Sequence, residues 1–180
     1  MNRDSQPWLS GALLAGCAVF VFDGRAFLLT ALMLFLPLLD RRWSMPAWRC
    51  SRAMLAGQLL CLLAGGLVLF LHPEIRALAI STLLLAALPE EWFFRAYFMY
   101  RLEQSGLRPV HANLGASLLF ALLHVPLQGV FGLSVFFPSL FFGWIYQRSR
   151  DLLLVILLHA LSNLVFFAWL KPLVFAGGTD

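Results

Sequence analysis

The sequence predicts an all-α membrane protein, a polytopic bundle of about seven transmembrane helices that encloses an intramembrane polar cavity. Two observations carry this prediction: the chain is very apolar, and most of its few charges fall between apolar runs. Of its 180 residues, 61% are hydrophobic and 12% are charged, whereas soluble domains average about 45–50% and 25%. We therefore expect one integral membrane domain over residues 1–180, with the lipid bilayer as its surroundings.

Seven apolar segments follow one another along the chain, and each is expected to form a helix. A helix that crosses a hydrocarbon core of about 30 Å needs roughly 20 residues, a length that the third and seventh segments reach easily. The first two are short and separated only by the sequence DGR at 23–25, so they form either a tight helical hairpin or partly interfacial helices. Pro126 and Gly129 mark a turn between the fifth and sixth segments. The segments are about 8–22, 26–39, 53–71, 77–100, 112–125, 130–146 and 152–170.

The positive charges predict the orientation, because loops on the cytoplasmic side carry more lysine and arginine. With the N-terminus inside, the inner loops hold nine positive residues and the outer loops three, while Arg95 lies within the membrane. We therefore expect a cytoplasmic N-terminus. The inner residues are Arg3, Arg41, Arg42, Arg49, Arg52, Arg101, Arg108, Arg148 and Arg150, and the outer ones are Arg25, Arg76 and Lys171.

A few polar side chains fall inside the predicted membrane helices. A charged side chain at the membrane centre costs at least about 2.5–3.5 kcal/mol, so such residues need partners or a water-filled cavity, and they commonly mark a functional site. Here they come from the fourth, fifth and seventh segments: Glu90, Glu91, Arg95, His124, His159 and Asn163.

The spacing within LPEEWFFR, residues 88–95, predicts which charges pair. Glu91 and Arg95 are four residues apart, hence on one helix face and within contact range. Glu90 is rotated by about 100° from Glu91, so we expect it to lack a cationic partner and to face the cavity. Pro89 removes a backbone donor and is expected to kink the helix there. The favoured interpretation of the Glu91–Arg95 pair is structural, an ion pair that sets helix packing.

The two histidines have companions at the same helical spacing. His159 and Asn163 share a face, and Phe120 lies one turn before His124. A carboxylate, two imidazoles and an amide are the groups needed to activate water and stabilise an oxyanion. Glu90, His124 and His159 are equally a possible Zn²⁺ ligand set. Each histidine taken singly is also a common hydrogen-bonding residue between membrane helices, so these alternatives stay open.

Other classes of function share some of these features. A proton-coupled transporter also buries Glu, Arg and His, but it usually shows repeated halves or broken helices, and we find neither in the sequence. A rhomboid-type serine protease would need Gly-x-Ser-Gly, whereas the chain has only GASL at 115–118. A non-catalytic membrane scaffold is a further alternative. Nucleic acid is not expected as a partner, because the basic residues lie in short loops at membrane boundaries.

Three motifs occur in order on three separate predicted helices. EEWFFR (90–95) fits Glu-Glu-x-x-x-Arg, FALLH (120–124) fits Phe-x-x-x-His, and HALSN (159–163) fits His-x-x-x-Asn. Together they resemble the CPBP family (CAAX proteases and bacteriocin-processing enzymes, also called Abi), relatives of the Rce1-type prenyl-protein endopeptidases. The resemblance covers about 85–170, within a motif-bearing core of about 77–170.

The resemblance implies an intramembrane endopeptidase of the glutamic type, which acts without a cofactor. A zinc metalloprotease with Glu90, His124 and His159 as ligands is the alternative mechanism. The roles implied by the family are general base for Glu90, water-holding for His124, oxyanion stabilisation for His159 and Asn163, and support of the site for Glu91, Arg95 and Phe120.

The resemblance also implies a substrate class and a location. The substrate would be a membrane-embedded or membrane-anchored protein or peptide, cut at a C-terminal sorting anchor or at a leader. Removal of a CaaX tail is less favoured, because the small chain resembles bacterial members. The expected location is the bacterial inner membrane.

Overall fold

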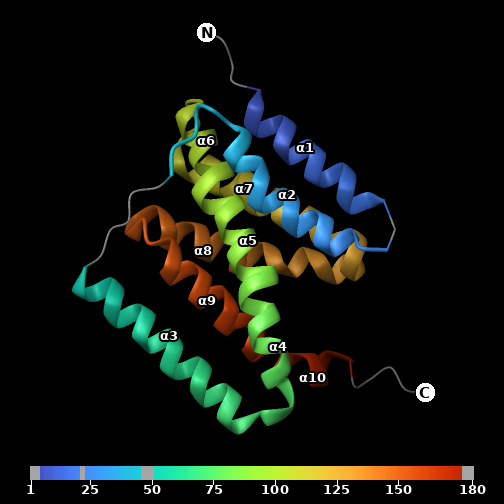
Figure 1. The fold of residues 1–180 in the computed structure, drawn as a ribbon, viewed down its shortest axis with the longest axis vertical. Helices are drawn as coiled ribbons and strands as arrows, with labels where there is room; N and C mark the ends of the chain where they lie inside the picture. Colours follow the sequence, from blue (N-terminus) through green and yellow to red (C-terminus); the bar gives the residue numbers. More distant parts are fainter. Residues whose placement is uncertain (1–4, 21–22, 46–50, 176–180) are drawn as a thin grey trace.

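The computed structural model describes residues 5–20, 23–45 and 51–175, and every regular element within them is helical (Figure 1). The predicted all-α class is thereby confirmed. Two of the short elements, η1 and η4, are 3-10 helices, and η2, η3 and η5 are π-helices. In chain order the elements are α1 (Gln6–Val19), α2 (Arg25–Leu39), α3 (Arg52–Leu71), η1 (Pro73–Ile75), α4 (Arg76–Ser81), η2 (Thr82–Ala87), α5 (Leu88–Glu91), η3 (Trp92–Met99), α6 (Tyr100–Gln104), α7 (Pro109–Gln128), η4 (Gly129–Val135), α8 (Phe136–Ser149), α9 (Leu152–Val165), η5 (Phe166–Leu170) and α10 (Lys171–Phe175).

Four helical stretches among the described residues are long and apolar enough to cross a membrane. Arg25–Leu39 is a shorter apolar helix that falls below this length. These lengths fit the polytopic membrane protein that the composition predicts. The four stretches are Arg52–Leu71, Pro73–Gln104, Pro109–Ser149 and Leu152–Leu173.

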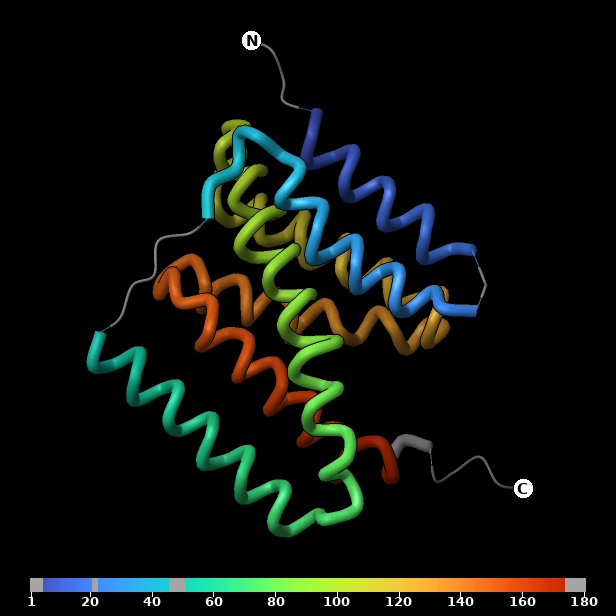
Figure 2. Tube along the Cα trace, in the orientation of Figure 1, coloured from blue at the N-terminus to red at the C-terminus, as the bar shows by residue number. Residues whose placement is uncertain are grey.

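The predicted count of about seven helices is not confirmed, because the described residues form six continuous helical stretches. The turn predicted between the fifth and sixth segments is itself helical: Pro126 lies inside α7, and η4 follows directly. Gly129 has a φ of 62°, a conformation that costs glycine little. The chain reverses at this point, and α8 packs back along α7 (Figure 2). The predicted turn is therefore present, and it lies between two helical elements with no loop of irregular structure between them.

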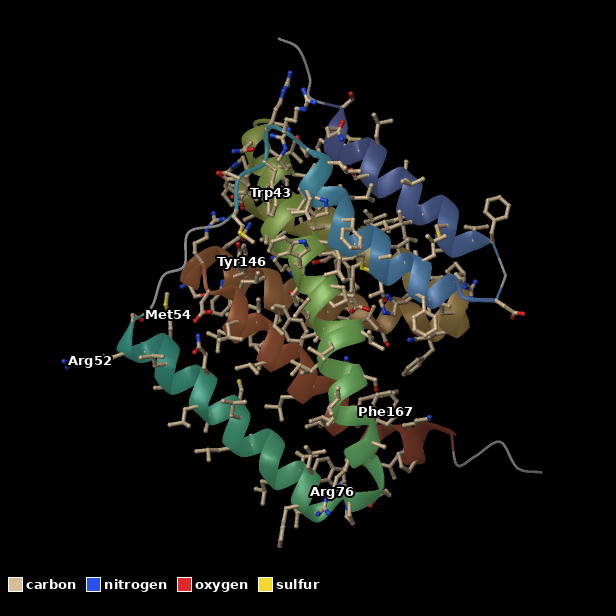
Figure 3. All side chains as sticks on the ribbon, in the orientation of Figure 1. Trp43, Arg52, Met54, Arg76, Tyr146 and Phe167 are labelled. Carbon is tan, nitrogen blue, oxygen red and sulfur yellow. The ribbon has the colours of Figure 1, made fainter. Side chains whose placement is uncertain are left out.

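The helices run between two ends of the molecule. The loop after α2, the start of α3, α6 and the α8–α9 junction lie at one end, whereas η1, η4, η5 and the start of α2 lie at the other (Figures 1 and 2). Figure 3 accordingly places Arg52 and Arg76 at opposite ends of α3. Among the described residues, the segments at the first end contain Arg41, Arg42, Arg52, Arg101, Arg108, Arg148 and Arg150, and those at the second contain Arg25, Arg76 and Lys171. This is the asymmetry on which the orientation prediction depends, and Arg3 and Arg49 lie outside the described residues.

The two short N-terminal segments form a helical hairpin, the first of the two predicted alternatives. α1 and α2 pack against each other, and they also pack on the motif-bearing helices, α1 on α7 and α2 on α5 and η3. Leu14 and Ala18 of α1 and Leu29 and Met33 of α2 are buried in the main apolar core. The hairpin therefore covers one side of the core that holds the site.

The stretch Pro73–Gln104 passes through the middle of the bundle (Figure 1). Its second half is almost entirely buried, with four aromatic residues in the main core: Phe93, Phe94, Tyr97 and Phe98. The single α-helical turn of α5 lies between two π-helices, η2 and η3. π-Helical turns are frequent at functional sites, and the α-helical turn between these two carries both glutamates of the first motif.

A polar cluster around Asp40 joins the helices at the end of the bundle that holds the loop after α2. Asp40, which caps α2, accepts hydrogen bonds from Arg101 Nε at 2.8 Å and from the Tyr97 hydroxyl at 3.3 Å. Ser10 of α1 lies 3.1 Å from the same hydroxyl, and Trp43 donates to the Ala96 carbonyl at 2.9 Å. Arg101, predicted to lie in an inner loop, is instead a buried residue of α6. Its side chain is buried because it pairs with Asp40 at the end of α2.

Candidate active site

The stretch Pro73–Gln104 supplies three charged side chains to the interior of the bundle. Arg95 Nε donates to Glu91 Oε2 at 2.8 Å, and both side chains have 0% exposure. The predicted pair is therefore present, and it is completely enclosed. Glu90, on the adjacent face, keeps 16% of its side-chain surface accessible. Two neighbouring, chemically identical residues thus occupy different environments.

His159 joins the two glutamates: its place beside Glu90 was expected from the motifs, whereas its contact with Glu91 was not. Its Nδ1 lies 2.8 Å from Glu91 Oε1, and its Nε2 lies 3.5 Å from Glu90 Oε2. Glu91 therefore uses one carboxylate oxygen for Arg95 and the other for the imidazole. Glu90, predicted to lack a cationic partner, has beside it an imidazole that is cationic only when protonated, because α5 packs against α9.

The fixed charges of this cluster leave one negative charge to be compensated. Glu90 and Glu91 contribute two negative charges and Arg95 one positive charge, in surroundings where an uncompensated charge is costly. One further proton, held by either Glu90 or His159, makes the cluster neutral. The two groups lie 3.5 Å apart.

His124 approaches the same region from α7. Its Nδ1 lies 2.8 Å from the Phe120 carbonyl oxygen, which can only accept, so Nδ1 carries the hydrogen and Nε2 is left as an acceptor. His124 is partly exposed and lies within electrostatic range of Glu90. The Phe120 ring contacts the His124 ring at a centroid distance of 4.5 Å. The turn of α7 that carries the second motif thus sets both the position and the tautomer of the histidine.

Asn163 lies one turn beyond His159 on α9 and is half-buried. Within the described part of the chain its side-chain amide makes no hydrogen bond. Glu90, His124 and Asn163 are partly accessible, whereas Glu91, Arg95 and His159 are buried. The three motifs therefore contain three partly accessible residues and three enclosed ones, and the enclosed three form a charge network.

Two residues of α8 contact the site although the sequence did not single them out. Ser139 accepts a hydrogen bond from Arg95 Nη2 at 2.8 Å. The Phe142 ring stacks on His159, with a centroid distance of 5.2 Å and an interplanar angle of 28°. A serine and a phenylalanine in an apolar helix are ordinary residues, so only their neighbours in space identify them.

The residues of the alternative zinc set do not form a metal-binding group. Across residues 5–20, 23–45 and 51–175, no three or more His, Cys, Asp or Glu side chains are arranged to hold a metal ion. Glu90 and His159 are neighbours, but Nδ1 of His159 is engaged by Glu91 and Nδ1 of His124 by a carbonyl. A metal at this site would need Nε2 of both histidines to turn toward one point.

Comparison with known proteins bears on the same region. A family model described as Rce1-like, type II CAAX prenyl endopeptidase Rce1-like, matches residues 72–165. This range covers more than half of the chain and contains the three motifs. No curated protein and no solved structure matches the chain.

Proposed function

The chain belongs to the Rce1-like family of type II CAAX prenyl endopeptidases, and we propose that it is an intramembrane endopeptidase whose water-activating base is Glu90. The family and the four membrane-capable helices make it an integral membrane protein. The observation that carries the proposal is the division between Glu91, neutralised by Arg95, and Glu90, which stays accessible at the edge of the cluster.

The proposed reaction begins with water bound between Glu90 and Nε2 of His124. Glu90 takes a proton from this water while the oxygen attacks the carbonyl carbon of the scissile peptide bond. The Asn163 amide, together with His159, donates to the oxyanion of the tetrahedral intermediate. Glu90 then passes the proton to the leaving amine as the C–N bond breaks. The reaction consumes one water and returns Glu90 to its initial state.

Glu91 and Arg95 act on the reaction only through their neighbours. With its charge compensated by Arg95, Glu91 stays ionised and holds Nδ1–H of His159, which directs Nε2 toward Glu90 and the substrate. Environment thus assigns different roles to two adjacent carboxylates, as in other enzymes with paired acids.

The substrate we propose is a membrane-embedded or membrane-anchored protein or peptide, cut at a C-terminal anchor or leader. The location we propose is the bacterial inner membrane with a cytoplasmic N-terminus, which places the arginine-rich end at the cytoplasmic face. Both proposals depend on the family and on the apolar surroundings of the site.

Two measurements test the proposal. Protein termini in membranes from cells that produce the wild type are compared with those from cells that produce Glu90→Ala, and cleaved termini should disappear in the variant. The purified protein is then assayed on a peptide spanning an identified cleavage site, with and without 1,10-phenanthroline. Cleavage by Glu90→Ala at the wild-type rate would exclude Glu90 as the base, and loss of activity restored by Zn²⁺ would favour the metalloprotease mechanism.

A further inference from the structure

The helix α8 carries none of the predicted catalytic residues, yet it borders the charge network. It packs against both α7 and α9, which hold the two site histidines. Ser139 and Phe142 lie three residues apart, on the same side of the helix, and are 1% and 4% exposed. Each contacts a different member of the network, Ser139 the guanidinium of Arg95 and Phe142 the imidazole of His159.

Ser139 is needed to orient Arg95. Of the guanidinium nitrogens, Nε donates to Glu91 and Nη2 donates to Ser139. Nη1 has no hydrogen-bond partner among the described residues, although it is buried. Without the serine hydroxyl, a single hydrogen bond would hold the guanidinium plane, and the arginine could turn about that bond. Because Glu91 bonds Arg95 through Oε2 and His159 through Oε1, a turn at Arg95 would be transmitted to the imidazole.

Phe142 restricts the imidazole directly. Its ring stacks on one face of His159, while the Phe120 ring meets His159 edge-on at a centroid distance of 6.1 Å and an interplanar angle of 78°. These aromatic contacts leave the imidazole little room to rotate about its Cβ–Cγ bond. Rotation would break the 2.8 Å contact of Nδ1 with Glu91 and move Nε2 away from Glu90.

We propose that α8 supplies two positioning residues for the hydrolysis: Ser139, which orients Arg95 and through it Glu91, and Phe142, which holds the His159 ring with Nε2 toward Glu90. The expected effect of these residues on the rate rests on the proposed function. Their expected effect on the position of the His159 ring does not depend on it. It extends the site to a fourth helix that none of the three motifs includes.

The test compares Ser139→Ala and Phe142→Leu with two matched controls. Ser117→Ala also removes a fully buried hydroxyl that donates to a neighbour, in this case Asn113 Oδ1. Phe141→Leu changes an adjacent phenylalanine that is 51% exposed. Each protein is purified, its thermal unfolding is recorded, and kcat and KM are measured on the cleavage-site peptide. We expect the two test variants to lose roughly 10- to 100-fold in kcat, the effect of a small misplacement of a reacting group, with KM nearly unchanged. Ser139→Thr, which keeps the hydroxyl, should recover most of the rate.

A second measurement separates positioning from general loss of stability. In ¹⁵N-histidine-labelled protein, the ring nitrogens of His159, assigned by their absence in His159→Gln, should show one fixed hydrogen-bonded form. In Ser139→Ala and Phe142→Leu these signals should average between forms, and in both controls they should match the wild type. Unchanged signals and kcat in the test variants, or losses no larger than those of the controls, would overturn the inference. If Glu90→Gln were fully active, the proposed function would fail, whereas the His159 spectra would still decide whether α8 holds the ring.

Discussion

The two adjacent glutamates are predicted to affect different properties, Glu91 the stability of the protein and Glu90 its activity. Glu91→Gln and Glu90→Gln are the same chemical change, one residue apart on one helix. Glu91 has 0% exposure and holds Arg95 and His159 through two 2.8 Å contacts. Glu90 keeps 16% exposure and has only the 3.5 Å contact with His159. We expect Glu91→Gln to reduce stability strongly and Glu90→Gln to reduce mainly activity.

The magnitudes follow from these contacts. Removing one partner of a buried ion pair costs about 3–5 kcal/mol. The new amide oxygen can still accept one hydrogen bond from Arg95, so the lower limit of about 3 kcal/mol is expected for Glu91→Gln. With about 2–4 °C per kcal/mol for a chain of this size, the unfolding midpoint should fall by roughly 6–12 °C. For Glu90→Gln a smaller loss is expected, because its one contact is longer, at 3.5 Å, and its side chain is partly accessible. Its kcat should fall roughly 10²- to 10⁴-fold, the usual contribution of a general base.

The assay is thermal unfolding of both detergent-solubilised variants, followed by peptide cleavage well below the lower midpoint. Glu103→Gln serves as a control, because Glu103 pairs with Arg150 at 2.9 Å near the surface and lies outside the site. Equal midpoints for Glu90→Gln and Glu91→Gln would refute the argument that burial distinguishes the two carboxylates. A Glu90→Gln variant with wild-type kcat would refute the assignment of the base.

Three other predictions concern different parts of the molecule. Gly132→Ala should lower kcat at least tenfold, because a Cβ there would lie 2.6 Å from the His124 carbonyl carbon and η4 would have to move away from that backbone. Gly66→Ala is the control: a Cβ there would have nothing within 4 Å, and kcat should be unchanged in the same assay. Asp40→Asn should cost about 3 kcal/mol in a denaturation measurement, because it removes the buried charge that pairs with Arg101. Its kcat at low temperature should match the wild type, and a drop in kcat would mean that this cluster also acts on the site. Preincubation with 1,10-phenanthroline should not slow cleavage, and a metal-reversible loss would contradict the glutamic mechanism.

Much of the site follows from local spacing. Four-residue intervals on a helix predict the Glu91–Arg95 pair and the placement of Phe120 beneath His124, and the structure has both. These contacts lie within one helix, where the distance between side chains depends only on the residue interval. Spacing along one helix gives Glu90 no partner, because the imidazole beside it belongs to another helix. The turn predicted from Pro126 and Gly129 is present, but those residues do not tell that the chain on its far side starts as a 3-10 helix, η4.

By itself the sequence determined that this chain is an apolar helical protein and that its three motifs lie on separate helices, because composition and helical periodicity are local properties. Tertiary structure alone decided that His159 bridges Glu91 and Glu90, that Ser139 holds Arg95, and that Phe142 stacks on the imidazole. Each of these contacts joins residues 17 or more positions apart, and which helix faces meet is set by how the side chains of the whole bundle pack. The local pattern places the chemical groups on their helices, and packing between helices decides which of them come into contact.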